Sequence, residues 1–254
     1  PMDRLVFTSN ATIKEQATVR QVLVNDLVNV STVGFKSSYD VALKSVKVDG
    51  PGFDSRFQAQ TISRDLIRMT PGAVMATGRP LDIAMADAAL LTVQAPNGDL
   101  AFTRRGDLRV NIQGQLEIGS GHLVQGDGGP ITIPPGLMVT ITPDGSVFAR
   151  DPAQEGQAAD VLIDRLRLRD ATNVSLSRRE DGLFKVTDKP NGTDIEVTEV
   201  LPRVIPQALE GSNVSAIEAM TRLIDQSRSF ETQIKIIKES KTLDESGSSM
   251  MKPA

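Results

Sequence analysis

Residues 209–220 read LEGSNVSAIEAM, and this stretch sets where the last long helix of the chain begins. Ser215 and Glu218 have the spacing of a capping box: the serine hydroxyl accepts a hydrogen bond from the Glu218 amide, and the glutamate carboxylate accepts one from the Ser215 amide. A helix from Ser215 to about Lys241 would be ~40 Å long. Beyond it, glycine, serines and a final proline predict a flexible tail over residues 246–254.

The apolar residues of this helix recur at the spacing of a coiled coil. Leu223, Phe230 and Ile237 are seven residues apart, and a second seam passes through Met220 but is interrupted by the polar Ser227. The residues predicted to build the inner-helix surface on this side are Ile217, Met220, Leu223, Ile224, Phe230, Ile234 and Ile237.

The N-terminal part of the chain predicts a second long helix, from Met2 to about Val30. Its apolar residues follow one another at steps of three and four, and polar residues occupy most of the other positions. The polar pair Ser31-Thr32 and then Gly34 end the pattern. The residues predicted to contribute to the inner-helix surface here are Val19, Leu23, Leu27 and Val30.

Apolar stripes on helices most often pack inside their own chain. Here each terminal helix has no visible helical partner except the other one, and a pair of helices cannot bury two wide stripes. We therefore expect neighbouring copies to cover the remaining apolar surface, so that the chain polymerises through its two ends.

The segment that follows the first helix is the least regular in pattern. Residues 37–75 contain partly alternating β-branched residues and are interrupted by Asp49-Gly50-Pro51-Gly52. This pattern predicts an extended connector or a hairpin.

Residues 76–208 read as short strands separated by turns. Segments such as 81–85 and 108–112 alternate between apolar and polar residues, as half-buried strands do. Three Asn-Gly or Asp-Gly pairs, which end at Gly98, Gly145 and Gly182, predict hairpin turns in which both central residues have positive φ. The expected fold class is α+β, with coaxial, coiled-coil-like helices from the two chain ends enclosing an all-β domain of short antiparallel strands.

Composition argues against catalysis and against nucleic-acid binding. The net charge is −4, whereas nucleic-acid binding favours a basic surface. Cysteine is absent and His122 is the single histidine, so thiolate catalysis is excluded and a transition-metal site is not expected. The glycines of residues 119–129 lack the spacing and the following helix of a phosphate-binding fingerprint. We expect no enzyme activity, no catalytic residues, no cofactor and no metal.

The sequence also bears on membranes and export. No apolar run reaches the ~18–20 residues that span a bilayer, so direct membrane insertion is not expected. Lys14, Glu15 and Arg20 stand where a secretory signal would need an uninterrupted apolar stretch. If the protein leaves the cytoplasm, we expect it to do so without a cleaved signal peptide.

Motifs next to the two helices resemble those of a known family. Residues 29–36, NVSTVGFK, are similar to the N-terminal signature of the rod and hook family, the axial proteins of the bacterial flagellum, and residues 211–220 are similar to its C-terminal signature. The motif residues are Asn29, Ser31, Thr32, Gly34, Phe35, Gly211, Asn213, Ser215 and Glu218. The interior resembles a proximal rod protein in segments 77–84, 102–106, 126–134, 181–184 and 230–235.

The resemblance implies a division into domains. Residues 1–36 and 209–245 would form an inner helical domain of the type called D0 in this family, which lines the export channel. Residues 37–75 would form the connector, and residues 76–208 an outer all-β domain of the type called D1.

The resemblance further implies a structural subunit of the flagellar proximal rod, the helical drive shaft that transmits torque across the periplasm. The implied partners are other copies of the chain, the rod proteins above and below it in the proximal and distal rod, and the flagellar type III export apparatus. A distal rod or hook-type axial protein is the alternative. A periplasmic carbohydrate-binding or wall-modifying protein is a more remote one.

Overall fold

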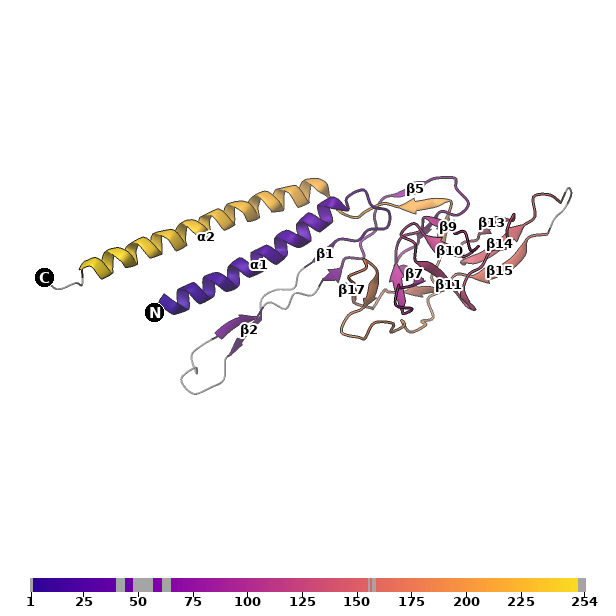
Figure 1. Ribbon diagram of the computed structural model, residues 1–254. Coiled ribbons are helices and arrows are strands. Elements are labelled where there is room, and N and C mark those ends of the chain that lie inside the picture. Colours follow the sequence, from indigo (N-terminus) through magenta and orange to yellow (C-terminus); the bar gives the residue numbers. More distant parts are fainter. Residues whose placement is uncertain are drawn as a thin grey trace. The chain divides into compact units, whose positions relative to one another are not determined.

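The fold consists of a helix at each end and a β-rich region between them (Figure 1). The computed structural model describes residues 2–39, 44–47, 57–60, 65–154, 156 and 159–250. The helices are α1 (Met2–Val28) and α2 (Ala216–Met250), and every strand pair between them is antiparallel within the described chain. The predicted α+β class, with terminal helices and an antiparallel β centre, is confirmed.

The chain divides into two compact units, which we call the helical unit and the β unit. The helical unit contains both helices and the antiparallel pair β2 (Lys44–Lys47) and β3 (Phe57–Gln60). The β unit contains residues 29–39 and 65–214. The sequence break expected at residues 49–52 lies outside the described residues.

The boundaries between the units differ from the expected ones. Residues 29–36 and 209–214, expected in the helical domain, belong to the β unit. The reason is strand pairing: β1 (Ser38–Tyr39) pairs with β4 (Leu66–Ile67), and β20 (Ala208–Glu210) pairs with β5 (Val74–Ala76). These pairs attach the segments beside both helices to the β unit.

Both helices also end at other residues than expected. Because α1 ends at Val28, Val30 lies in the turn that follows, where the Thr32 amide donates to the Asn29 carbonyl (3.1 Å). The helix α2 continues to Met250, which corrects the expected tail for residues 246–250. The Ser246 hydroxyl donates to the carbonyl of Thr242 one turn earlier (2.9 Å), so this serine is accommodated within the helix.

The β unit is built from many short strands. The remaining strands are β6 (Ile83–Met85), β7 (Ala89–Gln94), β8 (Leu100–Thr103), β9 (Leu108–Val110), β10 (Leu116–Ile118), β11 (Leu123–Gly126), β12 (Gly129–Pro130), β13 (Met138–Ile141), β14 (Ser146–Arg150), β15 (Val161–Arg165), β16 (Leu168–Asp170), β17 (Leu176–Arg178), β18 (Phe184–Val186) and β19 (Val204–Pro206). The largest sheet has the order β1-β4-β17-β18-β8-β7-β11-β10-β9, with β12 beside β11 and β16 beside β7. Strands β13, β14 and β15 form a second sheet, and β6 pairs with β19.

Strand β7 is buried on both faces and separates two apolar cores. Its residues Leu91 and Val93 belong to the larger core, while Leu90 packs in a smaller core with Phe102 and Phe184. Successive side chains of a strand point to opposite faces, which is why adjacent residues of β7 reach different cores. The sequence has no tryptophan, and the cores on the two sides of this sheet are built largely from Val, Ile, Leu and Phe.

The three predicted hairpin turns are present but have a different geometry. Between β7 and β8, the Gly98 amide donates to the Ala95 carbonyl (2.9 Å), and the Ala95 amide donates to the Asp99 carbonyl (2.8 Å). The same pattern recurs at Gly145 and Gly182. In each turn the glycine has positive φ but the Asn or Asp before it does not, so the expectation for both central residues is wrong. The turn is the longer hairpin type, in which one glycine takes the left-handed conformation.

Gly106 allows β6 to approach the segment that follows β8, and this contact can be tested. A Cβ at Gly106 would lie 1.7 Å from the Ile83 carbonyl oxygen, so we expect Gly106→Ala to lower the free energy of unfolding by about 1–3 kcal/mol or more. Urea unfolding followed by circular dichroism measures this loss. Gly128→Ala is the matched control, because its nearest neighbour would be a side-chain oxygen at 3.7 Å. Equal stability of the two variants would contradict the prediction.

Candidate functional site

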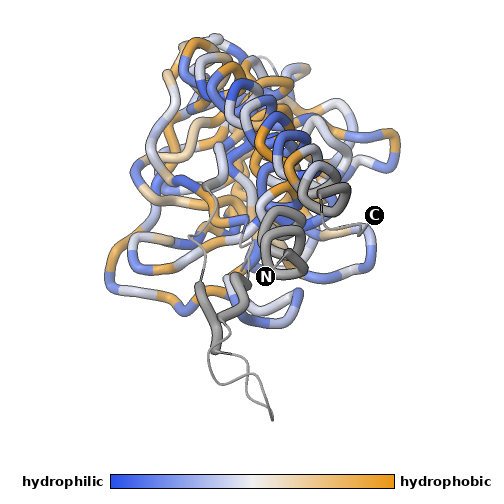
Figure 2. The backbone as a smooth tube through the Cα atoms, turned by 90° about the vertical axis from the view of Figure 1, so that its left-hand side faces the viewer, coloured by the Kyte–Doolittle hydropathy of each residue, from blue (hydrophilic) through white to orange (hydrophobic). Residues whose placement is uncertain are grey.

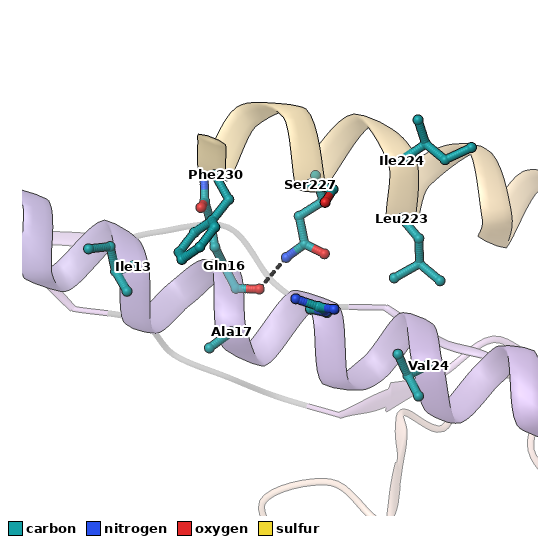
Figure 3. A pocket seen from close by; sticks show the side chains of 10 residues that line it. Ile13, Gln16, Ala17, Val24, Leu223, Ile224, Ser227 and Phe230 are labelled. Carbon is teal, nitrogen blue, oxygen red and sulfur yellow. Dashed lines mark hydrogen bonds between the residues drawn. The ribbon is translucent and has the colours of Figure 1, made fainter. Parts of the chain in front are cut away.

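The two terminal helices lie antiparallel within the helical unit. Gln16 Nε2 donates to Ser229 Oγ (3.2 Å), and Gln226 Nε2 donates to the backbone oxygen of Gln16. Ile13 lies near Phe230 (Figure 3), so residue numbers fall along α2 as they rise along α1. The two terminal helices, which the sequence predicted to pair with each other, are therefore in contact.

One face of α2 is less exposed than the rest. It begins at Ala219, which is buried, and continues through residues that alternate at steps of four and three. These steps make a repeat of seven residues, the spacing predicted for Leu223, Phe230 and Ile237. The half-buried residues of this face are Leu223, Gln226, Phe230, Gln233, Ile237 and Ser240.

A second apolar stripe of α2 is open. Ile217 is 81% exposed, Met220 52% and Ile224 53%, and Ile224 points away from α1 in Figure 3. The other predicted residues of α2 are half-buried, namely Leu223, Phe230, Ile234 and Ile237. Within the described chain, the helix pair thus covers one stripe of α2 and leaves the other uncovered.

The predicted residues of α1 that lie within the helix are at least half-buried. Leu23 is buried, and Val19 and Leu27 are half-buried. Val28, which the sequence did not single out, is 73% exposed. Val30 lies beyond the end of the helix in the β unit, so its assignment to the inner-helix surface is corrected.

The predicted capping box at the start of α2 is half formed. The Glu218 amide donates to Ser215 Oγ (3.3 Å), as expected. The Glu218 carboxylate instead accepts from Arg222 Nη2 (2.5 Å), one turn along the helix. An opposite charge at this spacing competes for the carboxylate that the sequence pattern assigned to the cap.

A largely apolar groove of about 470 Å³ runs along the helix pair (Figure 3). Arg20 is the one charged residue in its lining, which is otherwise formed by side chains such as Ile13, Val24, Leu223 and Phe230. Hydrophobic and hydrophilic residues are interspersed along the described helices (Figure 2). Apolar surface of this kind suits the packing of further helices.

The two family motifs meet inside the β unit, at a place we call the chain-end junction (residues 34–37 and 210–213). The Gly34 amide donates to the Glu210 carbonyl (2.7 Å), and the Asn213 amide donates to the Phe35 carbonyl (3.2 Å). The Ser37 amide donates to Asn213 Oδ1 (2.6 Å). Residues about 175 positions apart in the sequence therefore hold one another directly.

Asn213 connects the junction to a third segment. Its Nδ2 donates to the carbonyls of Arg68 and Thr70 and lies in hydrogen-bond contact with Thr70 Oγ1, each at 3.0 Å. The amide side chain supplies both donors and an acceptor, which is why this position suits asparagine.

The Glu210 carboxylate is the centre of the junction. It accepts from Lys36 Nζ (2.7 Å), from Arg104 Nε (2.8 Å) and Nη2 (3.0 Å), and from the Gly72 amide (2.9 Å). The side chains of Lys36 and Glu210 are 0% exposed and that of Arg104 is 1% exposed. Two buried cations thus share one buried anion.

The rest of the Arg104 guanidinium binds the turn between β6 and β7. Nη1 donates to the carbonyls of Asp87 (2.7 Å) and Ala89 (2.9 Å), and Nη2 donates to that of Met85 (2.9 Å). Asp87 has a φ of 45°, a conformation uncommon for residues other than glycine. Arg104 thus connects Glu210 to the turn that leads into β7.

Gly34 and Phe35 have separate roles in the junction. At Gly34, φ is +65° and a Cβ would lie 2.5 Å from the backbone of Arg104, so a side chain is excluded. The Arg178 guanidinium lies 4.4 Å from the centre of the Phe35 ring and donates to the Lys36 carbonyl. The aromatic motif residue is thereby fixed against β17.

The sequence predicted the two motifs but not the buried cluster of Lys36, Arg104 and Glu210 that joins them. Lys36 and Arg104 lie in segments that resemble the family and Glu210 lies directly before one, but nothing in the local pattern indicates that their charges meet. One signal was present: alternation along β20 places Glu210 on the same buried face as Ala208, an unusual place for a carboxylate unless it is paired.

Burial and pairing shift the pKa of both ends of the Lys36–Glu210 contact. For Glu210, burial raises the pKa, but hydrogen bonds from Arg104 and Lys36 and their positive charges outweigh it and hold the pKa below its usual 4.5. For Lys36, burial outweighs the contact with Glu210 and lowers the pKa from 10.5. A carboxyl group with a lowered folded-state pKa stabilises the fold above pH 4.5, and this contribution is lost as the pH falls through the folded pKa.

The described residues offer little for chemistry. They contain no group of three or more His, Asp or Glu side chains placed to hold a metal ion, and none of their helices is long and apolar enough to cross a membrane. His122 lies in the turn between β10 and β11, with Nδ1 2.9 Å from Ser120 Oγ. Terminal helices with an uncovered apolar stripe, and a β unit closed by residues 34–37 and 210–213, are features of a structural subunit.

Comparisons with known proteins give the family. Residues 86–149 match the family described as the flagellar hook protein FlgE/F/G D1 domain, and residues 205–250 match the flagellar basal body rod FlgEFG protein C-terminal family. The chain is 37% identical to the flagellar basal-body rod protein FlgF of Salmonella typhimurium and 36% identical to that of Escherichia coli, over 93% of this chain and of each relative. FlgG of Caulobacter vibrioides is 26% identical over 85% of this chain and 87% of that protein. The chain belongs to the FlgF family of flagellar basal-body rod proteins, which are structural and not enzymes.

The charge of Glu210 can be tested through the pH dependence of stability. We expect Glu210→Gln to lower the free energy of unfolding near neutral pH by about 3–5 kcal/mol, because two buried cations lose their anion. The wild-type stability should fall as the pH drops below 4.5, and the variant should show a flatter profile there. Urea unfolding at a series of pH values measures both effects.

Glu196→Gln is the control for this experiment, since Glu196 is an exposed acid of the same unit. It should keep the wild-type stability and the wild-type acid profile. Identical acid profiles in Glu210→Gln and the wild type would contradict the assignment of this titration to Glu210.

Proposed function

We propose that this protein is a subunit of the flagellar proximal rod that polymerises through its terminal helices into the drive shaft. The observation that carries the proposal is the open stripe of Ile217, Met220 and Ile224, on a helix whose other apolar face already contacts α1. Burial of apolar surface contributes about 25 cal/mol per Å², so a stripe repeated over many subunits supplies substantial association energy.

In this proposal α1 and α2 form a coaxial, coiled-coil-like inner layer with the helices of neighbouring copies, and this layer lines the export channel. The seven-residue spacing of the half-buried Leu223, Phe230 and Ile237 supports such packing. The β unit lies outside this layer and passes torque from subunit to subunit. We keep the division into an inner helical part and a β part, but the inner part is now limited to the helices α1 and α2 and no longer includes residues 29–36 and 209–214.

The proposed partners follow from the same assembly. They are other copies of the chain, the rod proteins above and below it in the proximal and distal rod, and the type III export apparatus, which would deliver the protein to the periplasmic rod without a cleaved signal peptide. The lower identity to FlgG disfavours the distal-rod alternative. Membership in a family of structural rod proteins disfavours the carbohydrate-binding or wall-modifying alternative.

The open stripe provides the test of polymerisation. We expect the double variant Met220→Gln/Ile224→Gln to keep the fold of the free protein but to lose incorporation into the rod, because only contacts between copies would use these side chains. Swimming in soft agar and the protein content of purified basal bodies, in cells that lack the wild-type gene, measure the loss.

Thr221→Gln/Asp225→Gln is the matched control, with the same spacing at exposed polar positions of the same helix. It should support swimming. Normal swimming by the Met220→Gln/Ile224→Gln variant would remove the support for assembly through this stripe.

A second prediction concerns the order of the helices before assembly. Isolated helices are marginal in water, and α2 has a largely exposed surface, so we expect residues 5–28 and 216–240 to be disordered in the free monomer and to fold on incorporation. Hydrogen exchange measured on monomer and polymer should show rapid exchange only in the monomer. Slow exchange of these amides in the monomer would contradict the hypothesis.

A further inference from the structure

The last strands of the β unit pair with some of its earliest ones. Strand β19 pairs with β6 through Val204 opposite Met85, and β20 pairs with β5 through Ala208 opposite Ala76. Val204 and Ala208 are both buried. Residues 204–210 therefore pair with strands that precede them by more than a hundred residues.

The same segment supplies the carboxylate that pairs with the buried side chains of Lys36 and Arg104. Among the described residues, Glu210 is the single carboxylate that accepts from Lys36 and Arg104, and their other acceptors are backbone carbonyls. Without residue 210, two cations would be buried with no counter-charge, which is strongly unfavourable. Without the whole segment, the Ser37 amide would also lose Asn213 Oδ1 and the Gly34 amide would lose the Glu210 carbonyl.

We infer that residues 204–213 act as a latch: the remainder of the β unit is not stable until this segment is in place. Closure needs both residues 34–37 and residues 210–213, so a chain that becomes available N-terminus first cannot complete the unit until its C-terminal part follows. Once closed, the latch holds together the segment that leaves α1 and the segment that leads into α2. This property is independent of whether the helices polymerise.

The chain offers a place to separate the latch from the rest. Residues 196–202 lie outside every described helix and strand, and Val197 and Leu201 are 80% and 73% exposed. A protease recognition sequence inserted between Glu199 and Val200 would allow the folded, full-length chain to be cut there. The cut leaves both fragments present and removes only the covalent connection.

The experiment compares the nicked protein with its separated fragments. We expect the two fragments to stay together on size exclusion, with slow hydrogen exchange in β7 and β8. After separation in urea, the N-terminal fragment refolded alone should show rapid exchange in these strands, and adding back the C-terminal fragment should restore protection. Slow exchange in β7 and β8 of the N-terminal fragment alone would overturn the inference.

Substitutions test the part played by charge. In the nicked protein, Glu210→Gln should weaken fragment association by about two to four powers of ten, whereas the control Glu196→Gln should leave it unchanged. If Glu210→Gln fails to fold, the double variant Lys36→Met/Glu210→Gln tests the role of charge. The wild-type cluster has two cations and one anion, and the double variant has the same net charge of +1. We expect the double variant to recover part of the lost association and protection, because one buried cation is left without an anion in place of two, and equal losses in the single and double variants would overturn the role of charge.

Discussion

The rest of the β unit depends on one buried carboxylate. Glu210 is shared by Lys36 and Arg104, and each of these cations also binds backbone carbonyls of a different segment. A buried charge is tolerated only where it is paired and hydrogen-bonded, so these contacts hold three distant segments in a single arrangement. The glycines at 34 and 72 follow from the same constraint, since a Cβ at either would lie within 2.5 Å of a neighbouring backbone.

The helical unit depends on apolar packing. In the β unit, polar groups buried at the chain-end junction decide which segments meet. In the helical unit, exposure is unevenly divided: Ala219 is buried, whereas Ile217, two residues before it, is 81% exposed. If the two helices were complementary only to each other, their pairing would bury all of their apolar surface. An uncovered second stripe instead suits a heterologous contact, in which one surface of a copy binds a different surface of the next. One unit is therefore closed by its own chain, whereas the other leaves an apolar stripe uncovered within the described residues.

Several elements could be predicted from sequence because their causes are local. Steps of three and four predicted both helices, Ser215 predicted the start of α2, and Asn-Gly or Asp-Gly pairs predicted the hairpins at Gly98, Gly145 and Gly182. Where a second partner competed, prediction failed. The Glu218 carboxylate binds Arg222 and not the Ser215 amide that the predicted cap requires. In each hairpin turn, only the glycine has positive φ. The extension of α2 to Met250 was missed because glycine and serine near its end resemble a tail.

The sequence by itself determined the α+β class, the positions of the terminal helices and the motifs beside them, since periodicity, capping and turn residues act over a few positions. Only the tertiary structure decided that Lys36, Arg104 and Glu210 share one site, and that residues 29–36 and 209–214 belong to the β unit. It also decided which of the two stripes on α2 stays open. These outcomes depend on contacts between residues up to 213 positions apart, and no local pattern specifies such contacts.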